Sequence, residues 1–64
     1  MNRYLAYDKT KTKNLIIRTE SVDSAINFCE AMDYEFERKI SEREFIYYTE
    51  VLFYPVVNLS RQRS

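Results

Sequence analysis

The first nineteen residues contain two short apolar runs with a polar stretch between them. The runs are Arg3–Tyr7 and Asn14–Thr19, and the stretch Asp8–Lys13 separates them. Because β-branched and aromatic residues favour strands and polar clusters favour turns, this pattern predicts a β-hairpin with a long, basic loop. The chain contains no glycine, so a tight primed turn is not expected there.

An amphipathic helix is predicted after the hairpin. Ser21 can accept hydrogen bonds from the free amides of a helix start, and Asp23 places negative charge where the helix dipole favours it. The apolar residues that follow recur with a period near 3.6, which is typical of a helix with one buried face. That face comprises Val22, Ala25, Ile26, Cys29 and Met32, and the opposite face carries Asp23, Asn27 and Glu30.

Two further strands are predicted in the second half of the chain. Apolar and charged residues alternate over Tyr34–Ile40, which indicates a half-buried strand. The stretch Glu44–Tyr54 is dominated by β-branched and aromatic residues, so we expect a strand that Pro55 ends or interrupts. An alternative remains for residues 35–46, whose Glu, Arg and Lys content would also support a helix with ion pairs between residues four apart.

The elements assemble into an α+β domain of order ββαββ, with a small antiparallel-rich sheet and one helix packed on one face. Residues 1–57 form this domain, and residues 58–64 form a polar, basic tail that we expect to be disordered. One helix covers one face of the sheet, so the other face would present Tyr47, Tyr48 and Tyr54 to a partner. We therefore expect a homodimer through the sheet or the last strand, or a partner docked there.

Charge is unevenly distributed although the net charge is zero. Residues 20–37 carry acidic side chains and no basic one, so they would attract the basic surface of a larger protein. The alternative is a solvated helix face that only maintains solubility. The candidate protein-binding residues of this segment are Glu20, Asp23, Asn27, Glu30, Asp33, Glu35 and Glu37.

The predicted hairpin loop carries Lys9, Lys11 and Lys13. Mobile positive charge suffices to contact phosphates, and exposed tyrosines can stack on bases, so nucleic acid is a second, less favoured partner. The lysines would otherwise belong to a solvated loop, or protect the sheet against edge pairing.

Equipment for catalysis is missing from the sequence. The chain has no histidine and no glycine, so the usual general base and the phosphate-cradling loops are absent, and we expect no enzyme activity and no cofactor. One cysteine cannot build a zinc site, and Cys29 is expected to be a buried small hydrophobe. A single cysteine also favours a reducing compartment, the cytoplasm. The sequence has no apolar stretch of about 20 residues, so we expect no membrane span.

The junction Thr19–Ile26, a strand end that runs into a capped helix with an early acidic residue and an alanine, resembles small bacteriophage accessory proteins. An inhibitor of bacterial RNA polymerase belongs to this group, although its last strand is very different from the last strand predicted for this chain. The resemblance implies a host-takeover or anti-defence protein that occludes a surface of a larger protein in the host cytoplasm. The leading hypothesis is thus a non-catalytic protein-binding module or inhibitor, and the alternatives are a nucleic-acid-binding protein and a structural homo-oligomer subunit.

Overall fold

Two antiparallel strands at the centre of the sheet confirm the predicted hairpin. The computed structural model describes residues 1–10 and 12–59. In it β1 spans Asn2–Asp8 and β2 spans Asn14–Thr19, and the strands pair from Asn2 opposite Thr19 to Tyr7 opposite Asn14. Because successive residues of a strand point to opposite faces, each strand supplies side chains to both sides of the sheet.

Asp8 organises the loop between these strands without help from glycine. Its carboxylate accepts hydrogen bonds from the Thr12 and Lys13 amides and from the Thr10 and Thr12 hydroxyls. Desolvation tends to raise the pKa of Asp8, but the hydrogen bonds outweigh this effect and hold its pKa below the ordinary value. A local aspartate network of this kind replaces a glycine turn.

The predicted helix is present as α1 (Val22–Met32). Ser21 caps its start, where the side-chain oxygen accepts a hydrogen bond of 3.2 Å from the Ser24 amide. Ala25 and Cys29 are buried, and they pack against the Tyr4, Ala6, Leu15 and Ile17 side of the sheet.

The predicted strand β3 (Tyr34–Ile40) is also present, and it lies antiparallel to β1 at one edge of the sheet. The pairing shifts by one residue, because Phe36 lies opposite Ala6 whereas Arg38 lies opposite Leu5. Glu37 therefore forms a bulge, and bulges and charged side chains are common protections of an edge strand.

The strand predicted over Glu44–Tyr54 is wrong. Residues Glu42–Ile46 form the short helix α2, which continues into the π-helix η1 (Tyr47–Val51). Ser41 and Glu44 explain the helix start, because each side chain accepts a hydrogen bond from the backbone amide of the other. This capping box satisfies two free amides and outweighs the strand propensity of the residues that follow.

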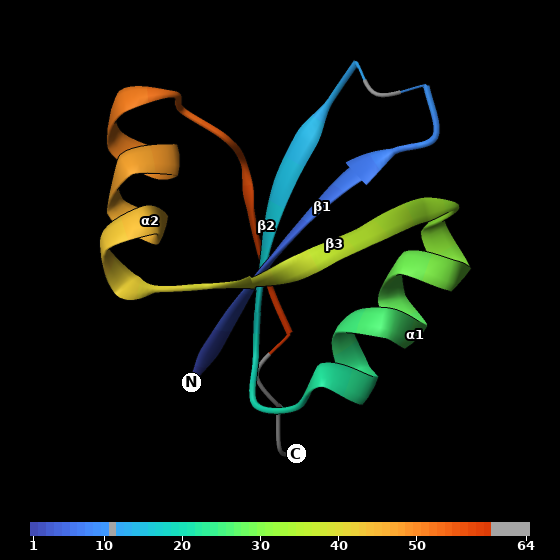
Figure 1. Cartoon of the computed structure of the whole chain (residues 1–64). Helices are drawn as coiled ribbons and strands as arrows, with labels where there is room; N and C mark the ends of the chain where they lie inside the picture. The colour runs from blue at the N-terminus through green and yellow to red at the C-terminus, as the bar shows by residue number, and fades with distance from the viewer. Residues whose placement is uncertain (11, 60–64) are drawn as a thin grey trace.

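A helical layer therefore covers each face of the sheet, and the prediction of one helix on one face is wrong (Figure 1). On the face away from α1, the buried side chains are Leu5, Ile16 and Ile40. Phe45, Tyr48 and Tyr54, which come from α2, η1 and the segment after η1, pack on them. Tyr48 and Tyr54, two of the three tyrosines that were expected on an open face, thus belong with Phe45 to a second small core.

The last strand, β4 (Val56–Asn58), lies parallel to β2 and completes the sheet order β3-β1-β2-β4. The helical segment α2–η1 carries the chain from one edge of the sheet to the other, as a parallel connection requires. The domain is thus a small α+β fold of order ββαβαβ with a mixed sheet, rather than ββαββ. Of the predicted tail, residues 60–64 lie outside the described part of the chain.

Candidate protein-binding surface

Phe53 is the most exposed large apolar side chain of the described residues, at 78%. Its backbone has a φ of 57°, a left-handed conformation that is unusual for a residue with a side chain. The flanking hydrogen bonds fix this geometry: the Leu52 amide donates to the Tyr47 carbonyl, and the Tyr54 amide donates to the Tyr48 carbonyl. Phe53 is therefore held outside the core by the way in which η1 ends.

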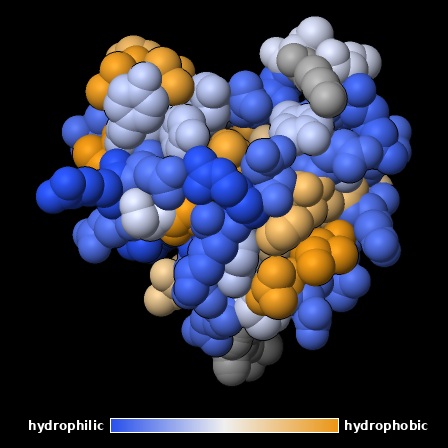
Figure 2. Space-filling model, viewed as in Figure 1, coloured by the Kyte–Doolittle hydropathy of each residue, from blue (hydrophilic) through white to orange (hydrophobic). Residues whose placement is uncertain are grey.

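Other apolar side chains are exposed around Phe53. Figure 2 shows hydrophobic side chains gathered at the C-terminal end of the α2–η1 segment and over α1. Around η1, the exposed apolar residues, which we call the η1 patch, are Ile46, Tyr47, Val51, Leu52, Phe53 and Val56. Of these six residues, Phe53 alone also lines the groove described next.

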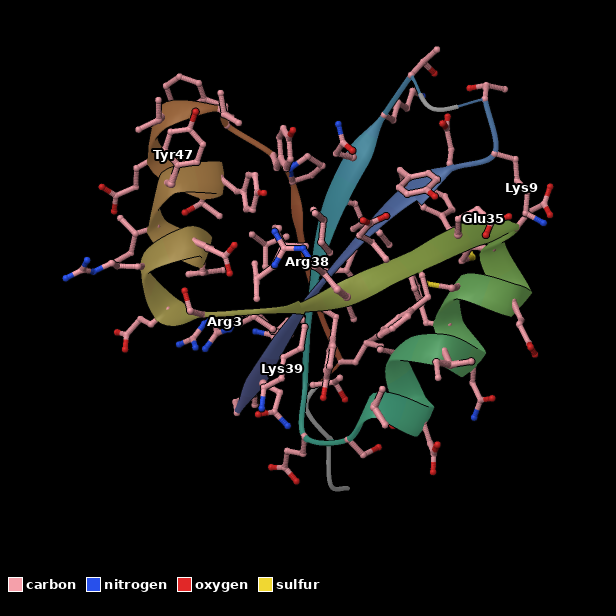
Figure 3. The ribbon with its side chains drawn as sticks, in the orientation of Figure 1. Arg3, Lys9, Glu35, Arg38, Lys39 and Tyr47 are labelled. Atoms are coloured by element: carbon pink, nitrogen blue, oxygen red, sulfur yellow. The ribbon has the colours of Figure 1, made fainter. Side chains whose placement is uncertain are left out.

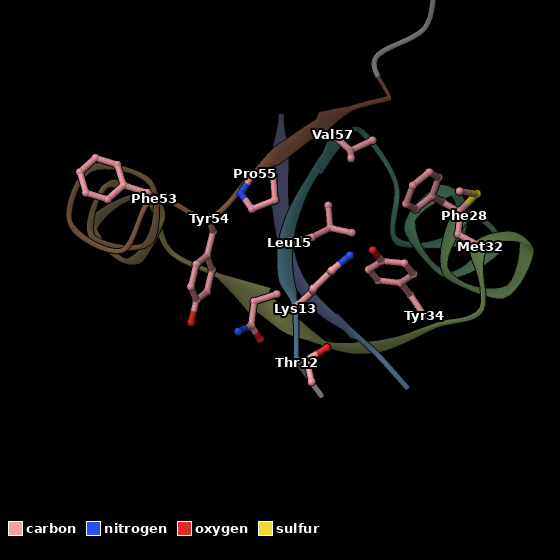
Figure 4. Close-up of a pocket in the computed structure, with 11 residues that line it drawn as sticks. Thr12, Lys13, Leu15, Phe28, Met32, Tyr34, Phe53, Tyr54, Pro55 and Val57 are labelled. Carbon is pink, nitrogen blue, oxygen red and sulfur yellow. The ribbon is translucent and has the colours of Figure 1, made fainter. Parts of the chain in front are cut away.

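A groove of about 490 Å³ lies next to Phe53 and reaches across β2 to the C-terminal half of α1 (Figure 4). We call it the Phe53 groove. Its polar rim is formed by Thr12, Lys13 and Asn14, and of the described residues that line it only Lys13 carries a charge. The apolar walls come from segments that are distant in sequence, among them Leu15, Phe28, Met32, Tyr34, Phe53 and Val57.

One side of the groove is an incompletely paired part of β2. β4 pairs with β2 only over Ile16–Arg18, so within the described chain no strand lies beside Asn14 and Leu15 on that side. Both residues line the groove. An extended peptide could therefore lie in the groove and add its backbone to the edge of β2.

The acidic segment does not form one free surface. Asp23, Asn27 and Glu30 are exposed on α1, as expected for its outer face. Asp33 and Glu35, in contrast, lie 3.1 Å and 4.0 Å from the Lys9 amine (Figure 3). Part of the negative charge that was expected to attract a basic partner is thus compensated within the domain.

The two remaining acidic candidates lie elsewhere. Glu20 is exposed just before α1, and its backbone carbonyl accepts a hydrogen bond from the Asn2 side chain. Glu37 is exposed at the bulge of β3. The structure therefore distributes the acidic candidates over the α1 surface, the Lys9 ion pairs and an edge strand.

The lysines of the hairpin loop are likewise separated in role. The hydrogen bond to Asp33 is the main cause that raises the pKa of Lys9. Lys11 lies outside the described residues, and Lys13 is exposed at the rim of the Phe53 groove. Lys9 is therefore an internal counterion, and Lys13 is the loop lysine placed beside a groove.

The tyrosine candidates are divided between surface and core. Tyr47 is half exposed in η1, whereas Tyr48 and Tyr54 are partly buried against Ile16 and Ile40. The α1 surface and η1 lie on opposite sides of the sheet (Figure 1), so a flat partner cannot contact both. Since both faces of the sheet are covered, a homodimer would have to use an edge strand or the outer surfaces of the helices.

The side chains that could hold a metal ion do not cluster in the described part of the chain, and the single cysteine is buried. No three His, Cys, Asp or Glu side chains of residues 1–10 and 12–59 are arranged to hold a metal ion. Cys29 is 2% exposed, and burial, with a smaller contribution from the charge of Glu35, raises the pKa of its thiol. Burial and a raised pKa both lower the reactivity of a thiol. In the described chain, no helix is both long and apolar enough to cross a membrane.

Comparison with protein-family models, curated protein sequences and solved structures found no match to this chain. Its function must therefore be inferred from its own residues. Apart from Lys13 and Tyr54, the residues that line the Phe53 groove were not among the candidates proposed from the sequence. Met32, for example, was predicted on the buried face of the helix, and no local pattern distinguishes a groove wall from a core position.

Proposed function

We propose that the protein is a non-catalytic protein-binding module whose Phe53 groove receives an extended, apolar segment of a larger protein. The observation that carries this proposal is Phe53 itself, which is 78% exposed at a φ of 57°. A left-handed backbone costs about 1–2 kcal/mol for a residue with a side chain. Strain of this kind is frequently retained at binding sites, where it is part of the function.

The lining of the groove indicates the chemistry of the partner segment. Its walls are mainly apolar, and Lys13 is the charged lining residue among those described. A complementary segment would present apolar side chains to Leu15 and Phe28 and a carboxylate to Lys13. The backbone of Asn14 would pair with the segment as one further strand.

The mode of action follows from the size of the module. A small domain that holds an exposed segment of a larger protein would cover the surface around that segment, which is how an inhibitor by occlusion works. The acidic residues of α1, Asp23 and Glu30, would then meet basic side chains of the same partner outside the groove. A second copy of this chain is the alternative occupant.

Selection of peptides from a random library, with the folded protein as bait, tests the proposal. We expect peptides rich in apolar residues with at least one Asp or Glu, and we expect them to shift the NMR signals of Asn14, Leu15 and Phe28. Phe53→Ser should weaken binding about tenfold, since an exposed aromatic anchor contributes on the order of 1–2 kcal/mol.

Val51→Ser is the matched control, because Val51 is 57% exposed but does not line the groove. It should leave peptide affinity unchanged. The proposal fails if no peptide is selected, or if the selected peptides bind Phe53→Ser and wild type equally well. Light scattering of the free protein separates the two occupants: concentration-dependent dimers that Phe53→Ser disrupts would identify a second copy in the groove.

A further inference from the structure

Two arginines lie directly opposite each other in the central strand pair. Arg3 of β1 is the register partner of Arg18 of β2, so both side chains point to the same face of the sheet. Figure 3 shows Arg3 near the stretch of chain between β3 and α2. Like charges at directly opposed positions repel and destabilise a sheet, so this arrangement requires a compensating interaction.

Phe45 compensates for part of this repulsion. The guanidinium carbons of Arg3 and Arg18 lie 4.9 Å and 5.8 Å from the centroid of the Phe45 ring. Both arginines are half-buried, and Phe45 packs on the core beneath α2. The ring attracts both cations through its π face, but it removes no net charge and accepts no conventional hydrogen bond.

The pair has no carboxylate partner and leaves two buried nitrogens without hydrogen bonds within the described residues. Among the residues that the structure describes, neither Arg3 nor Arg18 forms a salt bridge. The Nε atoms of both are buried and have no hydrogen-bond partner. Arg38, on the same face of the sheet, does have a carboxylate partner. Two of its nitrogens donate hydrogen bonds to the Glu44 carboxylate, at 3.3 Å and 2.9 Å.

We propose that Arg3 and Arg18 together bind a phosphate group, specifically the dianion of a phosphomonoester or of inorganic phosphate. Two guanidinium groups offer two planar forks, and each fork matches two phosphate oxygens. A phosphate dianion has enough charge and enough acceptor oxygens for both guanidinium groups. A carboxylate has less of both: the single carboxylate of Glu44 is the partner of one arginine, Arg38. Arg18 lies towards the end of β2 and Asn14 at its start, so this site is distinct from the Phe53 groove.

NMR titration with inorganic phosphate tests the proposal, because the Nε–Hε signals of individual arginines can be followed. The titration is performed at constant ionic strength with chloride as the balancing anion, and at a pH at which phosphate is mainly dianionic. We expect saturable shifts of the Arg3 and Arg18 signals, while Arg38 and Arg43 remain unchanged. Dimethyl phosphate, a monoanionic diester, should bind at least about tenfold more weakly, because it provides half of the charge.

Arg3→Gln and Arg18→Gln should each weaken phosphate binding at least about tenfold. Arg43→Gln, at an exposed position of α2, is the matched control and should bind as wild type does. Arg3→Lys and Arg18→Lys keep the positive charge, so they provide a second pair of variants if the Gln variants do not fold. Backbone NMR spectra verify the fold of every variant. The proposal is overturned if phosphate and chloride act alike, if dimethyl phosphate binds as well as phosphate, or if folded Gln variants retain full affinity.

Discussion

The ring of Tyr54 is stacked on the ring of Tyr48, with centroids 5.1 Å apart and planes inclined by 10°. The Tyr54 amide also donates a hydrogen bond of 2.9 Å to the Tyr48 carbonyl. These two contacts return the chain to the sheet after η1, and they leave Phe53 outside. The partly buried tyrosine pair and the exposed phenylalanine are therefore two parts of one structural unit.

Replacing Tyr54 by alanine should lower the free energy of unfolding by roughly 2–3 kcal/mol, because it removes a partly buried ring and its stacking contact with Tyr48. Tyr54→Phe keeps the ring and should cost less than about 1 kcal/mol. Urea denaturation followed by circular dichroism measures both changes. Tyr47→Ala is the control, since Tyr47 is 51% exposed; a loss as large as that of Tyr54→Ala would contradict the assignment of Tyr54 to the core.

Phe53→Gly and Phe53→Ala should differ in stability although both remove the exposed ring. Glycine adopts a φ of 57° without steric cost, whereas alanine does not, so the glycine variant should be more stable by about 1 kcal/mol. Both variants should lose affinity for peptides selected against the groove. Equal thermal midpoints of the two variants would show that the left-handed backbone at Phe53 carries no strain.

Glu44 should contribute to the acid sensitivity of the fold. The hydrogen bond from Arg38, with a further one from the Ser41 amide, lowers the pKa of the Glu44 carboxyl below its ordinary value of 4.5. A carboxyl whose pKa is lower in the folded state stabilises the fold above the unfolded value, and this contribution is lost as pH falls through the folded value. Stability should therefore decrease below pH 4.5 in wild type, and Glu44→Gln should decrease less steeply.

Urea midpoints measured from neutral pH down to about pH 3 provide the comparison for Glu44. Glu42→Gln is the control, because Glu42 is exposed in the same helical turn and Arg38 forms its ion pair with Glu44 instead. Glu42→Gln should show the wild-type pH dependence. If Glu44→Gln also follows the wild-type curve, the Arg38–Glu44 bond does not stabilise the fold.

Cys29 should react slowly with a soluble thiol reagent in the native protein. Burial raises the pKa of its thiol and also shields the sulfur from the reagent. Labelling monitored by absorbance should become fast only in denaturant. Rapid labelling under native conditions would indicate that α1 leaves the sheet readily.

Local patterns in the sequence were sufficient for β1, β2, α1 and β3, because each of these elements has a clear period and either a cap or a polar boundary. The same reasoning failed at residues 44–54. There the strand propensity of Ile46, Tyr47 and Val51 favoured a strand, whereas the capping box of Ser41 and Glu44 starts a helix. The uncovered face of the sheet needed an apolar cover, and tertiary demand of this kind regularly overrides propensity.

The candidate sites show the same limit. The Arg3–Arg18 pair follows from the register of a hairpin centred on its loop, so the sequence contains a signal for it. The Lys9–Asp33 ion pair joins the loop to the end of α1, and no pattern along the chain specifies that contact. The Phe53 groove depends on which strand lies beside β2, and that choice was decided by the unpredicted helix.

The parallel pairing of β4 with β2 also determines when the groove comes into existence. The hairpin closes between neighbouring residues, whereas Ile16 must wait for Val56, which reaches β2 only after α2 and η1 have crossed the sheet. Contacts between residues so distant in sequence form late, because a long loop must close first. The wall that Val57 contributes is therefore expected to form after the hairpin and α1, so a chain that has folded only these elements does not yet have the groove.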